Sequence, residues 1–293
     1  ATVQLNAADS GLYWYGNKAT INFDSATDAH GFYIPAVGDA FSNVAGASDV
    51  TFKGLILDGT AMTSGTIGFQ FINPDNVTVL ECESNNWGLS GCVIYEVTEN
   101  TAKASVRVYK GTGNNNHAIG IATLSGDASR VILDDIKSHG NGLGIDMSNG
   151  SATVSNVVCW NNTNGGMKTA VGARHLILSN ADLSNNTAGS ARGFYTNGDF
   201  DLIEMTNVRC HDNGNYGMQL AHSGQFLGSN LSMVNNGAQG FYQSGTTDSM
   251  VDNLACKDNG GRGILVTAGS CMLGKARTEN SGNYGLNVST TGD

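Results

Sequence analysis

The segment KDNGGRGILVTAG, residues 257–269, places a polar, glycine-rich turn directly before a short apolar run. The same arrangement recurs in HDNGNYGMQLAHSG (211–224) and in VNNGAQGFYQSGT (234–246). From Gly68 to Gly285, the glycines that precede the apolar runs lie 22 to 29 residues apart. Self-similarity at a period of about 20–50 residues is typical of solenoid folds. The sequence therefore predicts a coiled repeat protein.

The residue after each of these glycines is almost always large and apolar, which predicts that it points into a core. These residues are Phe69, Cys92, Ile121, Ile145, Met167, Phe194, Met218, Phe241, Ile264 and Leu286. A second set of positions recurs in step with the first and is marked by Asn156, Asn180, Asn207, Asn230 and Asn253. Apolar residues alternate on both sides of each asparagine, with the period of two that a half-buried strand requires.

Each repeat thus contains three short strands: one after the glycine, one before the asparagine and one after it. The sequence predicts an all-β, single-stranded coil of parallel strands with about ten to twelve turns, in which equivalent strands lie about 4.8 Å apart. Asparagine tolerates the left-handed conformation of a sharp corner, and its amide can bond to the asparagine of the next coil. An asparagine ladder is therefore expected.

The cysteines fit the same repeat as small core residues. Cys159, Cys210 and Cys256 share one inward position with Leu183 and Met233, so no two of these cysteines lie on neighbouring coils. A separation of two coils, roughly 9.6 Å, is too long for a disulfide bond. The cysteines therefore give no information about the redox compartment.

Composition excludes several classes of function. The 293 residues include 40 glycines and only 2 prolines, and the formal net charge is -10. Such an acidic chain is a poor partner for nucleic acid, which rewards clustered Lys and Arg. No apolar run approaches the roughly 18 residues of a membrane span, and no signal peptide follows Ala1. We expect neither nucleic-acid binding nor membrane insertion.

The repeats and the segment SDVTFKGLILDG (48–59) resemble the right-handed parallel β-helices of the pectate-lyase-like superfamily. That superfamily includes polysaccharide lyases, mannuronan C5-epimerases and phage tailspike depolymerases. The resemblance implies one β-helix domain over 1–293, with an N-terminal coil and cap region at 1–47 and regular coils at 48–293. It also implies a polysaccharide partner and an extracellular protein, either secreted or virion-associated.

In such enzymes the polysaccharide usually lies along the outer face of one sheet, so the outward residues two positions after each glycine are candidates. Five consecutive coils carry a polar or phenolic group there: Asp146, Lys168, Tyr195, Gln219 and Tyr242. Adjacent corners contribute Arg192, Arg174, His175, Asp199, Asp201 and His222. Tyrosine rings suit the faces of sugars. We expect Lys168, Tyr195, Arg192 and Asp146 to be catalytic, and Gln219, Tyr242, His222, Arg174 and Asp199 to bind substrate.

The preferred reaction is β-elimination on a uronate polymer, which needs a cation for the carboxylate, a base and an acid. Lys168 and Tyr195, one coil apart with Arg192 beside them, fit these roles. A tailspike-type glycoside hydrolase instead needs two carboxyl groups about 5–9.5 Å apart, for which Asp199 or Asp201 would have to reach Asp146.

The epimerase motif has a Tyr, an Asp three residues later and a His two residues after that. LGIDMS (143–148) keeps only Asp146 of these residues, with Leu143 and Ser148 in the other two positions. The remaining alternative is a non-catalytic glycan-binding or structural solenoid, because a fold does not determine a function.

Two further expectations concern cofactors and assembly. No metal is certain, although Asp199 and Asp201 could supply oxygen ligands to Ca²⁺. The last coil, YGLNVSTTG, has no cap, and an uncapped strand edge favours pairing with another chain. The chain is therefore expected to be part of a larger protein or of a homotrimer.

Overall fold

A computed structural model of the chain describes residues 3–4, 11–22, 30–34, 49–59, 67–72, 76–87, 90–95, 105–109, 112–114, 119–124, 130–148, 150–170, 172–282 and 284–288. These residues form parallel strands, and none of them forms a helix. They divide into two compact units, Ala1–Thr153 and Val154–Asp293. One domain over 1–293 stays a prediction, and most of the 1–47 cap region lies outside the described residues.

In the first unit, two walls of strands carry the chain around each coil. The first wall has the order β1 (Val3–Gln4), β3 (His30–Ile34), β5 (Ile67–Ile72), β8 (Ser90–Tyr95), β11 (Ile119–Leu124) and β13 (Leu143–Met147). The second wall has the order β10 (Thr112–Asn114), β7 (Glu83–Asn85), β4 (Thr51–Asp58), β6 (Val77–Leu80), β9 (Ser105–Tyr109) and β12 (Arg130–His139). β2 (Tyr13–Asn22) pairs with β4.

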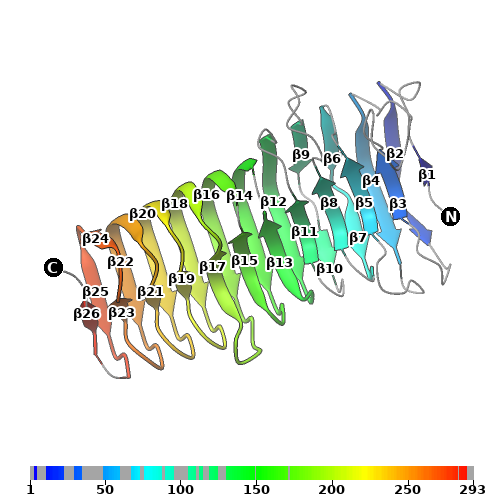
Figure 1. Cartoon of the computed structure of the whole chain (residues 1–293). Helices are drawn as coiled ribbons and strands as arrows, with labels where there is room; N and C mark the ends of the chain where they lie inside the picture. The colour runs from blue at the N-terminus through cyan, green and yellow to red at the C-terminus, as the bar shows by residue number, and fades with distance from the viewer. Residues whose placement is uncertain are drawn as a thin grey trace. The chain divides into compact units, whose positions relative to one another are not determined.

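The second unit repeats this plan more regularly. Its first wall has the order β15 (Gly165–Ala170), β17 (Arg192–Asn197), β19 (Met218–Leu220), β21 (Phe241–Gln243), β23 (Ile264–Val266) and β26 (Leu286–Val288). Its second wall consists of β14 (Gly150–Trp160), β16 (Ala173–Ser184), β18 (Phe200–His211), β20 (Gly224–Val234), β22 (Thr247–Lys257), β24 (Ser270–Leu273) and β25 (Ala276–Glu279). Figure 1 shows the strands of each wall side by side. Among the described residues, the first walls of the two units together contain twelve strands.

In β14, β16, β18, β20 and β22 the second and third predicted strands of a repeat are joined into one long strand, whereas β6 and β7, β9 and β10, and β24 and β25 stay separate. β18, for example, runs through both and bends at Asn207, whose φ is 57°. The asparagine ladder lies along this bend. Asn207 Nδ2 donates to Asn180 Oδ1 and Asn230 Nδ2 donates to Asn207 Oδ1, both at 3.1 Å. The ladder predicted from the sequence is therefore present in the second unit.

A second asparagine ladder is buried at the other corner, and the sequence reading did not identify it. Asn213 Nδ2 donates to Asn236 Oδ1 and Asn236 Nδ2 donates to Asn259 Oδ1, both at 2.9 Å. Asn236 Nδ2 also donates to the carbonyl of Cys210 at 3.1 Å. These amides satisfy the corner backbone inside the core, where an unpaired polar group would be costly.

The core confirms most of the predicted inward row, but the prediction is wrong for Leu286, which is 53% exposed because β26 is the last strand of its wall. Met167, Phe194, Met218, Phe241 and Ile264 have no exposed side-chain surface. The inward cysteines alternate with other residues, since Cys210 pairs in register with Leu183 on one side and Met233 on the other. All six cysteines are free thiols.

The recurring glycine follows from the close stacking of the corners. A Cβ at Gly193 would lie 2.6 Å from the carbonyl oxygen of Gly217 and 2.8 Å from the Cys210 Sγ. A Cβ at Gly217 would likewise lie 2.7 Å from the carbonyl oxygen of Gly240. Because each glycine has no side chain, the next coil (the next rung of the solenoid) can pack closely against it. The residue before each glycine faces outward.

Candidate active site

The first wall of the second unit carries a row of outward polar side chains. Lys168 pairs in register with Tyr195, Tyr195 with Gln219, and Gln219 with Tyr242. All four side chains are half-buried, and they alternate along each strand with the buried core residues. The strands of a parallel sheet are about 4.8 Å apart, so the row extends across the strands for roughly 14 Å. These four predicted side chains do share one outer surface.

A second row lies beside the first, formed by the residue that precedes each corner glycine. Its members are Arg192, Tyr216, Gln239, Arg262 and Tyr284. Of these, the sequence reading selected only Arg192. Backbone hydrogen bonds align the row. The N–H of the glycine after each member donates to the carbonyl oxygen of the next member of the row, as Gly193 N–H does to Tyr216 O at 3.1 Å.

Arg192 joins the two rows. Its Cζ lies 4.8 Å from the ring centroid of Tyr195 and 5.8 Å from that of Tyr216. The Tyr216 ring lies 5.1 Å from the Tyr242 ring, centroid to centroid. We call Arg192, Tyr195, Tyr216 and Tyr242 the arginine–tyrosine cluster. It combines a planar cation with three aromatic faces, which suits a ligand with both a negative charge and an apolar ring face.

Tyr216 belongs to this cluster although the sequence reading passed over it. The available signal was its position directly before Gly217, equivalent to that of Arg192 before Gly193. The Tyr195 ring also depends on a glycine, since a Cβ at Gly165 would lie 3.2 Å from Tyr195 Cε1.

The corner after the first wall holds Asp199 and His222. Asp199 Oδ1 accepts a hydrogen bond from the backbone N–H of Ser223 at 2.9 Å, so this carboxylate caps the next rung. The hydroxyl groups of Ser223 and Thr246 bond to each other at 2.5 Å, and Thr247 donates to the His222 carbonyl. Asp199 therefore already has a structural role at this corner.

Arg174 and Asp201 lie on the second wall, near the starts of β16 and β18, and both are exposed. His175, next to Arg174, forms an ion pair with Glu204, with 2.6 Å between Nε2 and Oε1. Arg174 is thus on the wall that follows the corner and does not belong to the row of Lys168 and Tyr195.

Asp146 belongs to the first unit, on β13. Its side chain is 3% exposed, and its Oδ1 accepts a hydrogen bond from the Ser148 hydroxyl at 2.7 Å. The position that the epimerase motif gives to His is therefore occupied by a serine that bonds to this aspartate.

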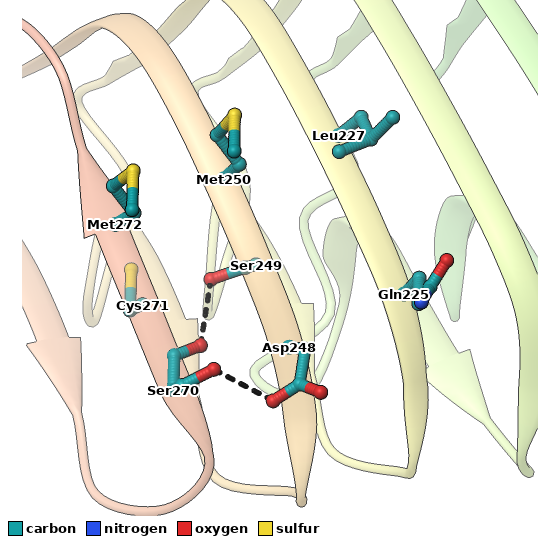
Figure 2. Close-up of a pocket in the computed structure, with 8 residues that line it drawn as sticks. All are labelled: Gln225, Leu227, Asp248, Ser249, Met250, Ser270, Cys271 and Met272. Atoms are coloured by element: carbon teal, nitrogen blue, oxygen red, sulfur yellow. Dashed lines mark hydrogen bonds between the residues drawn. The ribbon is translucent and has the colours of Figure 1, made fainter.

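The second wall has a groove of its own. A hollow of about 490 Å³ is lined by Gln225, Leu227, Asp248, Ser249, Met250, Ser270, Cys271 and Met272. Figure 2 shows Leu227, Met250 and Met272 at the same level of neighbouring strands, and Ser270 Oγ donating to Asp248 Oδ1 at 2.6 Å. None of the predicted site residues lines this groove.

Another group of titratable side chains lies on β16 and β18. His211 Nδ1 is 2.5 Å from Asp212 Oδ2, and its Nε2 is 3.0 Å from Asp182 Oδ1. The hydrogen bond with His211 holds the pKa of Asp212 below its ordinary value. Because both ring nitrogens face carboxylates, His211 is already engaged on both sides.

Metal binding has no prepared cluster in the part of the chain that the structure describes. There, no three side chains of His, Cys, Asp or Glu gather as metal ligands would. A calcium ion at Asp199 and Asp201 stays a prediction. The described residues also contain no helix long and apolar enough to cross a membrane.

Comparisons with known proteins agree with the fold. The family model of the right handed beta helix region matches residues 144–293. The A-module of the mannuronan C-5 epimerase AlgE4 of Azotobacter vinelandii superposes with a TM-score of 0.70, at 13% identity, over 99% of this chain and 88% of that chain. The periplasmic alginate epimerase AlgG superposes with a TM-score of 0.52, at 11% identity, over 91% of this chain and 78% of that chain. No curated protein sequence matches the chain significantly. The predicted right-handed parallel β-helix is confirmed.

Proposed function

Because the chain belongs to the family of right-handed β-helix regions, we propose that it binds an acidic polysaccharide across the first wall of its second unit and cleaves it by β-elimination. The observation that carries the proposal is the contact of Arg192 with Tyr195 and Tyr216, next to Lys168 in register with Tyr195.

The proposed ligand follows from the chemistry of this surface. Tyr195, Tyr216 and Tyr242 offer faces on which the C–H groups of a sugar ring can pack. Arg192 and Lys168 supply positive charge in a chain whose net charge is -10. A sugar that carries a carboxylate uses both features, whereas a neutral sugar would use only the tyrosine faces.

The proposed reaction assigns one role to each group. Arg192 pairs with the uronate carboxylate, which makes the neighbouring C5 proton more acidic. Lys168 Nζ, the proposed base, takes this proton, and the electron pair of the C5–H bond forms a C4=C5 double bond. The C4–O bond breaks with its electron pair on oxygen, and the Tyr195 hydroxyl protonates that oxygen. The products are a new reducing end and a chain that ends in an unsaturated uronate.

Related chemistries help to choose the polymers for a test. Two solved structures with a similar fold are epimerases of mannuronan or alginate by their names. Epimerisation and β-elimination share the removal of the C5 proton. The motif at LGIDMS keeps only Asp146, so we propose elimination, and alginate belongs among the polymers tested. Asp146 is given no step in this reaction.

The deciding experiment incubates the chain with a panel of acidic and neutral polysaccharides, including alginate and polygalacturonate. Absorbance of the unsaturated uronate is followed together with new reducing ends. Both signals rise if the proposal is right. Reducing ends alone would identify a hydrolase, and a changed NMR spectrum without cleavage would identify an epimerase. Binding without any reaction would identify a glycan-binding solenoid.

The setting of the reaction is proposed from its substrate. Acidic polysaccharides of this kind are found outside the cytoplasm, so we propose that the protein acts extracellularly. AlgG, with a similar fold, is a periplasmic protein. Assembly into a homotrimer stays a prediction, which light scattering coupled to size-exclusion chromatography would test.

A further inference from the structure

The contact between Arg192 and Tyr216 is repeated further along the same row. Arg262 Cζ lies 5.8 Å from the Tyr284 ring centroid, the same distance as Arg192 Cζ from the Tyr216 ring centroid. In both pairs the tyrosine belongs to the rung that follows the arginine. The second unit therefore presents two equivalent arginine–tyrosine pairs on one surface.

Backbone hydrogen bonds fix the separation of the two pairs. Gly193 N bonds to Tyr216 O, Gly217 N to Gln239 O, and Gly240 N to Arg262 O, at 3.0–3.1 Å. Arg192 and Arg262 are thus three rungs apart, which corresponds to roughly 14 Å. Because these bonds join successive corners directly, the separation does not depend on a mobile loop.

Gln239 lies between the two arginines in the row, and its side-chain oxygen lacks a hydrogen-bond donor. Its Oε1 is buried and has no hydrogen-bond partner among the described residues, and the same is true of the Nε atoms of Arg192 and Arg262. Buried polar atoms in native proteins nearly always have a partner. The three residues as a whole are only half-buried, so a ligand with hydroxyl and anionic groups that draws these side chains outward would supply the missing donor and acceptors.

The Arg262 pair contributes little to the fold itself. The Tyr284 side chain is 62% exposed, so its contact with Arg262 buries little apolar surface. A tyrosine face does, however, restrain the guanidinium and so lowers the entropy that binding would cost. The geometry suits a guanidinium that is preorganised to bind an anion.

From these contacts we infer that Arg262, Tyr284 and Gln239 form a second anion-binding subsite, and that one acidic polysaccharide chain bridges Arg192 and Arg262. The inference rests on the proposed function, because it extends the same surface. The ligand is an acidic polysaccharide long enough to place two negative groups roughly 14 Å apart. Shorter oligosaccharides reach only one arginine.

The test is a titration of the intact protein with acidic oligosaccharides of increasing length, in the cold, with their integrity checked by mass spectrometry. Once the ligand can bridge both arginines, the second contact becomes intramolecular, and affinity should rise by about tenfold or more. Arg262→Ala removes this rise. Arg262→Lys, which keeps the charge but loses the planar stacking, restores part of it.

The matched control is Arg277→Ala, because the Arg277 side chain is 79% exposed, lies on the second wall and pairs with Glu279. It should bind like the wild type at every length. If Arg192→Ala weakens binding but Arg262→Ala matches Arg277→Ala at all lengths, the second subsite is wrong and the proposed function stands. If the wild type binds no acidic oligosaccharide, both are wrong.

Discussion

Arg192 and Lys168 are neighbouring cations with different physical properties. The guanidinium of Arg192 is planar and faces two tyrosine rings, so its N–H donors have a fixed direction. Lys168 ends in a compact amine on a flexible stem, which can release and accept a proton. Arg192 therefore suits a carboxylate that stays bound throughout the reaction, and Lys168 suits proton transfer.

Removal of either proposed proton-transfer group should slow the reaction strongly. We expect Lys168→Ala and Tyr195→Phe each to lower the initial rate of double-bond formation by at least about 100-fold, because a positioned acid or base contributes about 10²–10⁴-fold. The rate is measured by absorbance of the unsaturated product. Lys257→Ala serves as the control. Lys257 lies on the second wall, outside the arginine–tyrosine cluster, and its Nζ is 3.5 Å from Glu279 Oε1. Full activity in both variants would show that the active site lies elsewhere.

The buried thiols predict a specific response to alkaline pH. Burial raises the pKa of the Cys256 thiol from 9.0 to about 12. The unfolded chain ionises this thiol near pH 9 while the folded chain keeps it protonated. Its contribution to the free energy of unfolding is thus complete below about pH 9 and falls as the pH rises toward about 12.

We therefore expect the stability advantage of the wild type over Cys256→Ala to shrink as the pH is raised from about 8 to about 11. Urea unfolding of the two proteins at each pH measures this difference. Both proteins share all other titrating groups, so those effects cancel. A constant difference would contradict the assigned burial of the thiol.

At the scale of the element, the corners combine two separate constraints. Glycine is needed where the next rung approaches, because any side chain would meet its carbonyl. Asparagine is needed where a buried backbone turn requires both a donor and an acceptor, which one amide side chain supplies. The sequence NNG at residues 235–237 places both solutions within one corner.

The first constraint is testable with two glycines of one unit. A Cβ at Gly217 would lie 2.7 Å from the Gly240 oxygen and 2.8 Å from Asn236 Nδ2, whereas a Cβ at Gly189 would meet nothing within 4 Å. Gly217→Ala should therefore lower the free energy of unfolding by about 1–3 kcal/mol. Gly189→Ala should leave it unchanged or raise it slightly. Urea unfolding compares the two, and equal effects would contradict the stacking.

At the scale of the molecule, the two walls of the second unit present different chemistry. The first shows tyrosine and arginine, and the second shows the thioethers of Met250 and Met272, which are 52% and 63% exposed. Met205, Met218 and Met233 are at most 1% exposed. The walls should therefore respond differently to an oxidant.

We expect dilute hydrogen peroxide to convert Met250 and Met272 to sulfoxides well before the buried methionines, because oxidation follows exposure of the sulfur. Peptide mapping by mass spectrometry measures the order. The unfolded protein provides the control, in which all methionines should oxidise at similar rates. Early oxidation of Met218 in the folded protein would show that the core row is open to solvent.

The period of the repeat explains which features the sequence could predict. Equivalent residues one period apart must stack, so the register of Lys168, Tyr195, Gln219 and Tyr242 followed directly from counting. The direction of the chain around a corner cannot be predicted from the period of the repeat. Tyr216 was missed because its outward direction depends on Gly217 pointing inward, and Arg174 was placed near the row although the corner carries it to the second wall.

The buried asparagine ladder at the corners also affects where the protein deamidates on storage. Asn-Gly sequences lose their amide through attack of the glycine nitrogen on the asparagine side chain, which requires both to move freely. At Asn213-Gly214, Asn236-Gly237 and Asn259-Gly260 the glycine N–H is bonded at 2.8 Å to the preceding rung, and the amide is held in the ladder. Exposed Asn164 and Asn197, before Gly165 and Gly198, have no place in that ladder. Slow deamidation on storage should therefore begin at Asn164 and Asn197, and the corners that repeat most often in the sequence should be the last to change.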